Sequence, residues 1–402
     1  MESTNTQHEL TTQEVLSRGV ADIKPSTQGL ASLMGKRKIR LYLGIDPTGN
    51  QLHLGHMVVL RKLQQFADLG HEVILLIGNG TVKIGDPTGK DKTRPMLTEE
   101  QIDENFKTWK AQASKVLNFS KIKIMRNGDW LDKLTMPEII KLMAKTTVQQ
   151  LLERDMFQER IKNDLPIYSH ELIYPLLQGY DSVEMNVDLE IGGNDQIFNM
   201  MVGRQLQKIY NNKDKYVLGT PLLIGTDGRK MGKSYNNFIS LTAEANDLYG
   251  KLMSVVDDVI LEYFTLLTNV SLQEIENMRK ALADKLVNPM ELKKVLAFTL
   301  TEMLHDTKAA KEAAEHFERT VQKKEVGEKD TQPLPLASSA TVLDATMATG
   351  IVTSRSDGKR LIEQGAVQKD GEKFTDPNAV LNARPGNILR VGKFGYFKIE
   401  EE

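Results

Sequence analysis

Apolar residues alternate with polar ones at the start of the stretch 39–56, and the spacing changes after it. Every second residue from Ile39 to Ile45 is apolar, which predicts a strand with one apolar face. The turn-forming run Asp46-Pro47-Thr48-Gly49 follows. Beyond it, Val59, Leu63 and Phe66 recur at helical spacing, and Gly70 stands where a helix commonly ends. The pattern predicts strand, loop and helix in succession.

The same change of period recurs along the chain as far as about residue 241. Further strands are expected at 73–77, 122–125, 187–191 and 217–224. Helices are expected at 98–120 and, for the most part, at 136–178. Strands that alternate with helices favour a parallel sheet with helices on both faces. We therefore expect an α/β fold with a doubly wound parallel sheet over residues 1–241.

The remaining segments differ in character from this alternating part. The first 35 or so residues form a polar lead-in with one short helix, for which Thr11 and Glu14 provide a capping box. Residues 242–320 show helical periodicity only, and 321–337 are charged and then rich in proline, as in a linker. Residues 338–402 predict a small α+β unit.

Composition narrows the class of protein. The 402 residues carry a net charge of −2, so any nucleic-acid site must rest on local basic faces. The chain has no cysteine, which excludes disulfides, cysteine-ligated zinc and a cysteine nucleophile. No apolar run approaches the roughly 20 residues needed to span a membrane, and the N-terminus has no hydrophobic signal region. We expect a cytoplasmic protein without a membrane partner.

Two histidines and a glycine stand at the start of the helix that follows the first strand: His53, Gly55 and His56. In an open α/β sheet this is a place for phosphate groups, because free N–H groups and the helix dipole face an anion there. Gly55 would let a flat group approach the backbone. Two other interpretations remain, a metal-binding pair and a structural pair, although no third ligand is evident nearby.

Lys230 and Lys233 lie three residues apart on a glycine-containing loop after a strand. Mobile ammonium groups suit a negative charge that develops only in the transition state. A Walker A loop is excluded because Asp227 occupies its first glycine position, and the run 85–90 (GDPTGK) is also one residue short. The remaining alternative is an exposed charged turn.

Two polar groups interrupt apolar segments. Tyr174, Gln178 and Asp181 share one helical face, which indicates either a ligand pocket or a satisfied buried network. At the end of the strand 187–191 comes Gly192-Gly193-Asn194-Asp195-Gln196. The glycines allow a ribose or base to approach, and Asp195 could accept hydrogen bonds from ribose hydroxyls. The alternative is an ordinary turn with Asn194 or Asp195 as N-cap.

Taken in order, these motifs resemble those of class I aminoacyl-tRNA synthetases of the tyrosyl type. His53-Leu54-Gly55-His56 resembles the "HIGH" motif, and the preceding Y-x-G-x-D-P-T of residues 42–48 resembles its tyrosyl version. The loop 230–234 (KMGKS) is similar to "KMSKS", with Gly232 in place of serine. The pattern Y-x-x-x-Q-x-x-D at 174–181 resembles the tyrosine-binding motif, and 192–196 resembles G-G-[ST]-D-Q, with Asn194 as a departure. Residues 354–367 resemble the S4 RNA-binding fold.

The resemblance implies a set of site residues. Catalysis is implied for His53, His56, Lys230, Lys233 and Thr48. ATP binding is implied for Asp46, Gly55, Gly193, Asp195, Gln196 and Ser234. Tyrosine binding is implied for Tyr42, Gly44, Asp86, Tyr174, Gln178 and Asp181, with Tyr42 and Asp181 at the phenol hydroxyl and Asp86, Tyr174 and Gln178 around the ammonium group. Lys90 and Arg94 match basic positions near pyrophosphate, and Arg355, Lys359 and Arg360 form a basic helix edge for tRNA.

The resemblance also implies the reaction and the partners. Tyrosine and ATP, with Mg²⁺ on the phosphates, would give tyrosyl-adenylate and pyrophosphate, and tyrosine would then pass to the 3′ end of tRNA(Tyr). The helical module and the S4-like domain would bind tRNA, and a homodimer would form through the insertion at about 120–180. Neither a tightly bound cofactor nor zinc is expected.

Three alternatives stay open. A tryptophanyl-tRNA synthetase would have no use for a Tyr–Asp pair aimed at a phenol. A catalytically silent RNA-binding paralogue is expected to lose the phosphate-handling residues, which are present here. A small-molecule adenylyltransferase shares the HxGH motif but gives no reason for the helical module or the tail.

Overall fold

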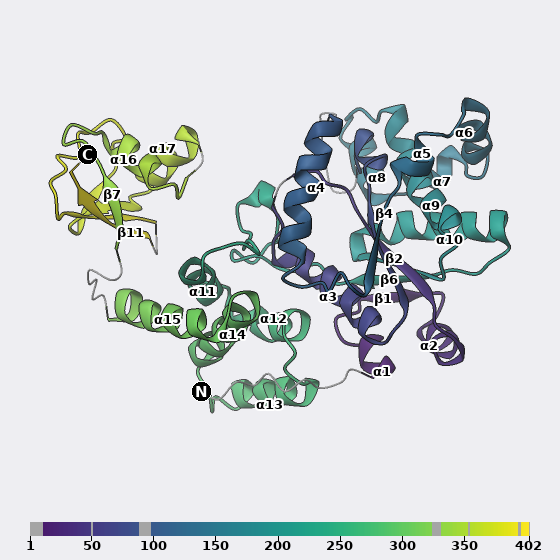
Figure 1. The fold of residues 1–402 in the computed structure, drawn as a ribbon, viewed down its shortest axis with the longest axis horizontal. Helices are drawn as coiled ribbons and strands as arrows, with labels where there is room; N and C mark the ends of the chain where they lie inside the picture. The colour runs from purple at the N-terminus through teal and green to yellow at the C-terminus, as the bar shows by residue number, and fades with distance from the viewer. Residues whose placement is uncertain are drawn as a thin grey trace. The chain divides into compact units, whose positions relative to one another are not determined.

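The computed structural model describes residues 11–49, 51–87, 98–323, 331–352, 354–392 and 395–401. It divides into two compact units, Met1–Ala243 with Val255–Leu296, and Glu244–Ser254 with Ala297–Glu402. The first unit contains a six-stranded sheet of strand order β1-β6-β5-β2-β3-β4 (Figure 1). Its strands are β1 (Asp22–Lys24), β2 (Arg40–Ile45), β3 (Glu72–Ile77), β4 (Ile122–Arg126), β5 (Leu189–Gly193) and β6 (Tyr216–Thr220).

The strands β2 to β6 are parallel to their neighbours, and only β1 is antiparallel, to β6. Because β3 and β4 extend the sheet on one side of β2 while β5 and β6 extend it on the other, the order of strands reverses between β2 and β5. In open α/β sheets, ligands bind beyond the carboxyl ends of the strands at such a reversal. The doubly wound fold expected from the sequence is therefore confirmed, with one antiparallel edge strand.

Helices connect the strands of this sheet and pack around it. They are α1 (Thr12–Val15), α2 (Thr27–Lys36), α3 (Leu54–Asp68), α4 (Glu99–Ala113), α5 (Gly128–Leu131), α6 (Met136–Met143), α7 (Val148–Leu152), α8 (Asp155–Lys162), α9 (Tyr174–Glu184) and α10 (Ile197–Asn211). Helix α3 packs against β2, β3 and β5, and α9 packs along α10. Between sheet and helices lies a buried cluster of Tyr42, Ile74, Leu76, Met185 and Val187.

Local sequence accounts for several element ends. The capping box predicted at Thr11 and Glu14 is present: the Thr11 hydroxyl accepts from the Glu14 N–H, and the Glu14 carboxylate accepts from the Thr11 N–H. Gly70 follows the end of α3 with a φ of 73°, a conformation that glycine adopts without strain. Strand β6 ends at Thr220, four residues earlier than predicted, because Pro221 has no N–H to donate.

Two elements near the N-terminus were missed by the sequence prediction. Strand β1 and helix α2 occupy a segment that was expected to contain one short helix only. Three residues are too short for a periodic pattern, and β1 exists because Ile23 and its neighbours pair with β6. Helix α2 buries Leu30 and Met34 and begins at Ser26, whose hydroxyl accepts from the Gly29 N–H.

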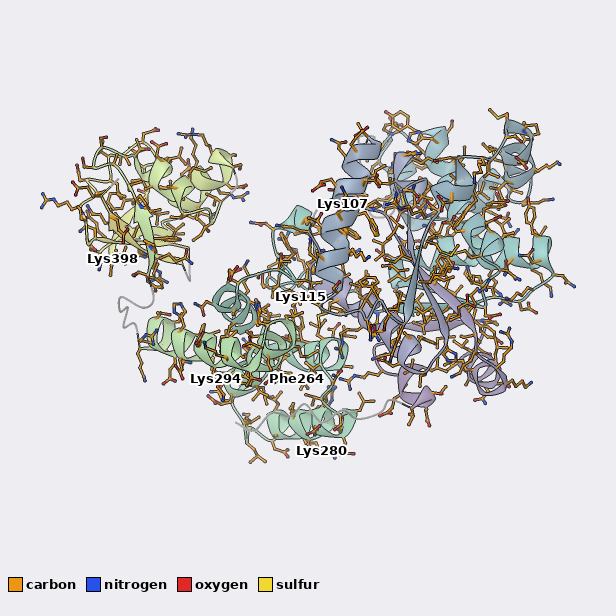
Figure 2. All side chains as sticks on the ribbon, in the orientation of Figure 1. Lys107, Lys115, Phe264, Lys280, Lys294 and Lys398 are labelled. Atoms are coloured by element: carbon orange, nitrogen blue, oxygen red, sulfur yellow. The ribbon has the colours of Figure 1, made fainter. Side chains whose placement is uncertain are left out.

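The segment after residue 242 is helical, as predicted, and its helices divide between the units. Helices α12 (Ile260–Leu267) and α13 (Leu272–Ala283) belong to the first unit, and α14 (Pro289–Leu304) begins there. The buried Arg18 donates to the carbonyls of Phe264, Thr265, Thr268 and Val270, which joins the N-terminal segment to the end of α12. Figure 2 shows Phe264 among these helices, whereas Lys107 and Lys280 lie on the surface.

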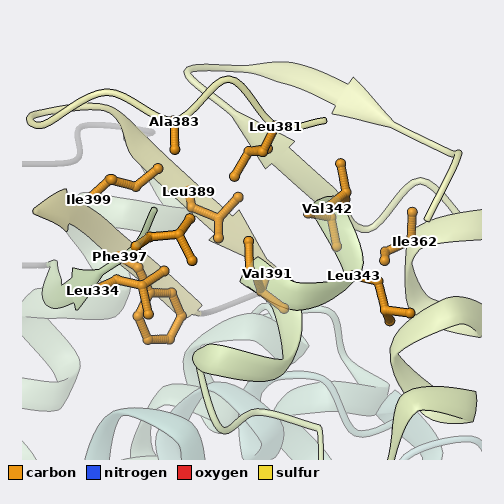
Figure 3. Close-up of a cluster of buried hydrophobic side chains, with 13 residues drawn as sticks. Leu334, Val342, Leu343, Ile362, Leu381, Ala383, Leu389, Val391, Phe397 and Ile399 are labelled. Carbon is orange, nitrogen blue, oxygen red and sulfur yellow. The ribbon is translucent and has the colours of Figure 1, made fainter. Parts of the chain in front are cut away.

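The second unit contains α11 (Ala245–Met253), α15 (Thr307–Phe317), α16 (Val342–Ala348), α17 (Arg355–Glu363) and a five-stranded sheet. Its strand order is β7-β11-β10-β8-β9, with β7 (Gln332–Pro335), β8 (Val367–Lys369), β9 (Glu372–Phe374), β10 (Ile388–Val391) and β11 (Gly395–Glu400). Figure 3 shows its core, in which Leu343 and Ile362 face Leu389, Val391 and Phe397. The small α+β unit predicted for the tail is therefore present.

None of the helices in the described residues has the length and apolar character needed to cross a membrane.

Candidate active site

A cavity of about 240 Å³ lies at the carboxyl ends of the parallel strands, where the strand order reverses. Its lining includes residues predicted for catalysis, for ATP binding and for tyrosine binding: Tyr42, Gly44, Asp46, Thr48, His56, Asp86, Tyr174, Gln178, Asp181, Gly193 and Gln196. Strand β2 supplies Tyr42, and Asp46 follows its last residue. Helix α9 supplies the stripe predicted on one helical face, and the end of β5 supplies the glycine pair. The fold thus brings together residues more than 150 positions apart in the sequence.

The two histidines begin helix α3 and contact each other, with ring centroids 4.0 Å apart. The Nδ1 atom of His53 accepts from the Gly55 N–H at 3.1 Å, and the Nδ1 atom of His56 accepts from the His53 N–H at 3.2 Å. A neutral imidazole that accepts at Nδ1 carries its proton on Nε2. Both side chains therefore have an Nε2–H donor for an oxygen atom near the helix start.

The histidines are held in the neutral state. Burial lowers the pKa of His53 to about 2, with His56 and Lys233 adding to the effect. Burial also lowers the pKa of His56 to about 4, again with a contribution from Lys233. At neutral pH the pair can thus donate hydrogen bonds to phosphate oxygens, and the positive charge near the helix start comes from lysine.

The loop that contains Lys230 and Lys233 is shaped by backbone pairing and by Asn237. The Met231 N–H donates to the Leu223 carbonyl at 2.8 Å, and Met231 is buried. Asn237 is 3% exposed; its amide accepts from the Gly232 N–H at 2.9 Å and donates to the Lys230 carbonyl at 3.0 Å. This one side chain therefore fixes the backbone on both sides of Met231 and leaves the lysine side chains to project from the loop.

The lysine loop and the histidine turn are joined directly. The Leu54 N–H donates to the Ile239 carbonyl, and the Leu241 N–H donates to the Leu52 carbonyl, so the segment after the loop pairs with the entry to α3. On the other side of the loop, a Cβ atom added to Gly49 would lie 3.0 Å from Nζ of Lys233. Lys233 therefore lies beside the turn that connects β2 to the histidines.

Lys230 contacts the glycine-rich turn after β5. Its Nζ donates to Oδ2 of Asp195 at 2.9 Å, and both side chains are partly exposed. Asp195 lies in the short helix η3 (Asn194–Gln196), which follows β5. Its N-cap is Gly193, so the interpretation of Asn194 or Asp195 as N-cap is wrong. The carboxylate predicted to bind ribose is thus paired with a predicted catalytic lysine.

At the other end of the cavity, carboxylates and hydroxyls form a connected network. Asp181 accepts from the Asn127 amide at 3.0 Å and from the Trp130 indole at 2.8 Å. Thr81 donates to Asp46 at 2.7 Å, and Tyr174 donates to the other oxygen of Asp46 at 2.9 Å. Burial raises the pKa of Asp181 well above its usual range, against the two hydrogen bonds, which favour the ionised carboxylate.

Tyr42 lies at the floor of the cavity and is fully buried. Its hydroxyl oxygen lies 3.0 Å from the Ser182 hydroxyl and 3.4 Å from the main-chain carbonyl oxygen of Gln178. Burial raises the pKa of the Tyr42 phenol well above its usual range, and Glu190 and Asp181 reinforce the effect. Tyr42 therefore remains a neutral phenol that can donate or accept one hydrogen bond toward a ligand.

Asp86 is held from two sides. It accepts from the Gln196 amide at 2.7 Å, and the guanidinium of Arg154, which is 5% exposed, lies 3.9 Å away. Arg154 comes from the segment between α7 and α8 and was not identified from the sequence. Gln196 and Asp86, predicted for ATP and for tyrosine respectively, are therefore direct neighbours.

Several predicted residues are not part of this assembly. Lys90, Arg94 and the side chain of Ser234 lie outside the described residues. Arg355, Lys359 and Arg360 all lie on α17 in the second unit, where Arg355 pairs with Asp344 and Arg360 with Asp357.

Further residues that line the cavity or support it were not predicted from the sequence: Thr81, Asn127, Trp130, Arg154, Ser182, Glu190, Lys215 and Asn237. A signal existed for two of them. Thr81 follows β3 and Asn127 follows β4, and parallel strands end at the same edge of a sheet.

Within the described ranges, no three His, Cys, Asp or Glu side chains gather in a way that could bind a metal ion.

Comparison with known proteins agrees with this geometry. Residues 34–322 match the family described as tRNA synthetases class I (W and Y). The tyrosine–tRNA ligase of Thermotoga maritima is 42% identical over 388 residues, 96% of each chain. Tyrosine–tRNA ligase 2 of Photorhabdus laumondii is 45% identical over 369 residues, which are 90% of this chain and 92% of that one.

Solved structures show the same fold at lower identity. A tyrosyl-tRNA synthetase from Archaeoglobus fulgidus, in complex with L-tyrosine, has a TM-score of 0.62 at 22% identity and covers 75% of this chain and 98% of its own. A truncated mitochondrial tyrosyl-tRNA synthetase from Aspergillus nidulans has a TM-score of 0.63 at 20% identity, with 78% and 94% covered. The resemblance inferred from the motifs is confirmed, and the chain belongs to the class I tRNA synthetases for tryptophan and tyrosine.

Proposed function

We propose that this chain is a tyrosine–tRNA ligase that activates L-tyrosine with ATP and then transfers it to tRNA(Tyr). The observation that carries the proposal is one cavity with two chemically different ends. One end has a phenol and a carboxylate, Tyr42 and Asp181, at a buried floor. The other end is lined by the neutral His56, with His53, Lys230 and Lys233 on the turns next to it. The first end suits a hydroxyl-bearing side chain, and the second suits a triphosphate.

In the first step, a carboxylate oxygen of tyrosine attacks the α-phosphorus of ATP. The new P–O bond forms as the bond to pyrophosphate breaks, so no protein nucleophile is required. Mg²⁺ enters with ATP as part of the substrate. The protein supplies position and charge, as in other phosphoryl transfers.

At the phosphate end, we assign His53 and His56 as Nε2–H donors to phosphate oxygens, together with Lys230 and Lys233. The lysines lie on a loop and can move with the developing charge, which favours the transition state over the ground state. Thr48, which follows β2 and lines the cavity, and Gly55, in the first turn of α3, would contribute to this end. Asp195 would exchange Lys230 for ribose hydroxyls when ATP binds.

At the amino-acid end, we assign Tyr42 and Asp181 to the phenol hydroxyl of tyrosine. Asp86, Tyr174 and Gln178 would surround the α-ammonium group. Phenylalanine would leave the buried polar atoms of Tyr42 and Asp181 unpaired, which is costly. Discrimination between tyrosine and phenylalanine by tyrosyl-tRNA synthetase is the standard example of this effect.

In the second step, tyrosine moves to the 3′-terminal adenosine of tRNA. We propose residues 1–241 as the catalytic domain, 242–320 as an anticodon-binding module, 321–337 as a linker and 338–402 as an S4-like RNA-binding domain. Arg355, Lys359 and Arg360 lie on the exposed edge of α17 and are suited to phosphate contacts. Since its substrate is tRNA, we place the enzyme in the cytoplasm.

We also propose a homodimer. The helical insertion carries apolar side chains on its surface: Met136 is 69% exposed, Ile140 59% and Val148 57%. Ile209 and Tyr210 on α10 are likewise exposed. Apolar patches of this kind are typical of subunit interfaces. Sedimentation equilibrium of the full chain, compared with an Ile140→Lys variant, tests it: a monomeric wild-type protein would contradict the proposal.

The activity itself is tested by isotope exchange between pyrophosphate and ATP, with tyrosine, phenylalanine or tryptophan and without tRNA. Exchange with tyrosine alone is expected. Exchange with tryptophan would assign the chain to the other specificity of its family and contradict the roles of Tyr42 and Asp181. A folded protein that supports no exchange would favour a silent RNA-binding paralogue.

A further inference from the structure

A fully buried lysine lies behind the amino-acid end of the cavity, and the proposed mechanism does not use it. Lys215 precedes β6, and its side chain is 0% exposed. Its ammonium group donates to the carboxylate of Glu190, to the Ser182 hydroxyl at 2.7 Å and to the Met200 carbonyl at 3.1 Å. An ammonium has three donors, so all three are satisfied inside the protein.

The partner carboxylate connects this lysine to the cavity. Glu190 lies on β5, lines the cavity, and has a side chain that is 2% exposed. Its Oε1 accepts from Nε2 of Gln178 at 3.0 Å, and its Oε2 accepts from Lys215 and from the Ser182 hydroxyl at 3.3 Å. Glu190 therefore contacts the hydroxyl of Ser182, which lies within reach of the Tyr42 hydroxyl, and the side-chain amide of Gln178, whose main-chain carbonyl also lies near that hydroxyl.

The surrounding residues leave room for this pair. A Cβ atom on Gly203, in α10, would lie 2.5 Å from Nζ of Lys215, 2.9 Å from the Ser182 hydroxyl and 3.3 Å from Oε2 of Glu190. The lysine ammonium also lies 5.9 Å from the centroid of the Tyr42 ring, within the range of a cation–π contact. The pair thus supports Tyr42 from behind both directly and through Ser182.

The Glu190 carboxylate fixes the orientation of the Gln178 amide. A carboxylate only accepts hydrogen bonds, so it binds the NH₂ group of Gln178 and not its carbonyl. The amide carbonyl is then left for the cavity, where it can accept from an ammonium group. If Glu190 were protonated, it could donate to that carbonyl, and the amide could turn its NH₂ toward the ligand ammonium.

We propose that Glu190 and Lys215 are positioning residues for the amino acid: the ammonium of Lys215 holds the Glu190 carboxylate in place, and the carboxylate orients Gln178 and Ser182 for binding tyrosine. This inference rests on the proposed function of the cavity. It extends that function to two residues that touch no reacting atom. Their effect is expected on the affinity for the amino acid and not on the binding of ATP.

The test uses the pH dependence of the KM for tyrosine in pyrophosphate exchange by the full-length enzyme. In Lys215→Met, Glu190 loses its cation and takes up a proton as the pH falls, so the amide of Gln178 is released. We expect the KM for tyrosine to rise about tenfold at pH 6.5 and to return toward the wild-type value at pH 8.5. The KM for ATP should stay unchanged, and the wild-type KM for tyrosine should not vary with pH.

Other charged groups face this pair and need a control. Asp181 and the Tyr42 phenol lie near Glu190, and Arg204 lies near Lys215 and donates to its backbone carbonyl. The double variant Glu190→Gln/Lys215→Met removes both charges, is close in shape, and retains Asp181. Its KM for tyrosine should be independent of pH, and pH dependence that persists in it would assign the effect to Asp181 and overturn the proposal.

Lys62→Met provides a matched control. Lys62 is also a buried lysine, 3% exposed, but it donates to the Val15 and Arg18 carbonyls and does not line the cavity. Its loss should leave the KM for tyrosine unchanged at each pH. If the KM for tyrosine of Lys215→Met is also independent of pH while the wild type binds tyrosine, only the present inference is wrong. If the wild-type enzyme fails to bind tyrosine by calorimetry, the proposed function falls as well.

Discussion

Two lysine–carboxylate pairs lie near the candidate active site, Lys215–Glu190 and Lys230–Asp195, and they differ chiefly in exposure. The side chains of Lys215 and Glu190 are 0% and 2% exposed, and those of Lys230 and Asp195 are 48% and 28% exposed. The first pair is surrounded by further hydrogen bonds from Ser182 and Gln178. The second pair joins a loop to a turn, and both of its side chains are partly exposed.

This difference separates two ways of binding a ligand. Breaking a buried pair leaves an uncompensated charge in a poorly solvated place, so the amino-acid end is fixed before the ligand arrives. An exposed pair contributes little to stability. The contact between Lys230 and Asp195 can therefore break at small cost in free energy, which leaves Lys230 to bind phosphate and Asp195 to bind ribose. The amino-acid end thus provides selection through preorganised groups, and the phosphate end provides groups that move during the reaction.

The largest expected effect is on stability, from the same substitution at each end. Lys215→Met should lower the free energy of unfolding by about 3–5 kcal/mol because it leaves Glu190 without its cation. Lys230→Met should change it by about 1 kcal/mol or less. Both tryptophans, Trp109 and Trp130, lie in the first unit, so urea unfolding followed by tryptophan fluorescence reports on it.

Equal losses in the two variants would contradict the contrast between the ends. The double variant Glu190→Gln/Lys215→Met serves as the control, because removing both charges of a buried pair commonly restores stability.

The second effect is on the rate. Lys233→Met should lower kcat for pyrophosphate exchange by about 10²–10³-fold, since it removes a charge that acts on the transition state. The affinity for tyrosine, measured by calorimetry, should not change. Lys208→Met, which removes an exposed lysine on α10, is the control and should retain full activity. A rise in the KM for tyrosine without a fall in kcat would mean that Lys233 acts on tyrosine binding and not on the phosphates, which would contradict its assignment.

The sequence predicted the residues of the exposed pair, Lys230 and Asp195, but not those of the buried pair, Lys215 and Glu190. The histidine turn, the lysine loop and the stripe on α9 follow local patterns of the chain. The structure places His56 and the α9 stripe in one cavity and pairs Lys230 with Asp195 next to it. Lys215 lies in the polar run 211–215 and looks like a loop lysine. Its burial depends on Glu190, 25 positions away, and on the space left by Gly203. No local pattern of the sequence predicts that Lys215 is buried or that it pairs with Glu190.

The same limit applies to the ionisation of the histidines and to the shape of the lysine loop. The motif places His53 and His56 at a helix start, but their neutral state follows from burial and from Lys233, which is far away in sequence. Asn237 determines the loop backbone from outside the motif. By contrast, the capping box at Thr11 and the glycine after α3 were predictable because their interactions are local.

The third effect concerns the floor of the cavity. Ser182→Ala removes the hydroxyl that contacts Tyr42 and accepts from Lys215. The KM for tyrosine should rise about five- to tenfold, which corresponds to the loss of one or two hydrogen bonds, and the KM for ATP should not change. Parallel titrations of both substrates in the exchange reaction measure this. An equal rise in both KM values would mean that the two ends are not independent.

The smallest expected effect arises at the histidine turn. The folded protein keeps His53 and His56 neutral until the pH falls to about 2 and about 4, respectively. The unfolded chain takes up these protons near the ordinary pKa of about 6.5, so it binds more protons and stability falls as the pH drops below that value. Between pH 7 and 5.5 we expect a loss of about 1 kcal/mol for each histidine.

His53→Asn isolates one of the two contributions. Asparagine retains a side-chain acceptor at the start of α3, where the His53 ring accepts from the Gly55 N–H, but it does not titrate. Urea unfolding at pH 7 and at pH 5.5 should therefore show a smaller acid-induced loss in this variant than in the wild type. An equal loss in both proteins would mean that His53 takes up its proton in the folded state, and the turn would then contribute a positive charge of its own to the binding of phosphate.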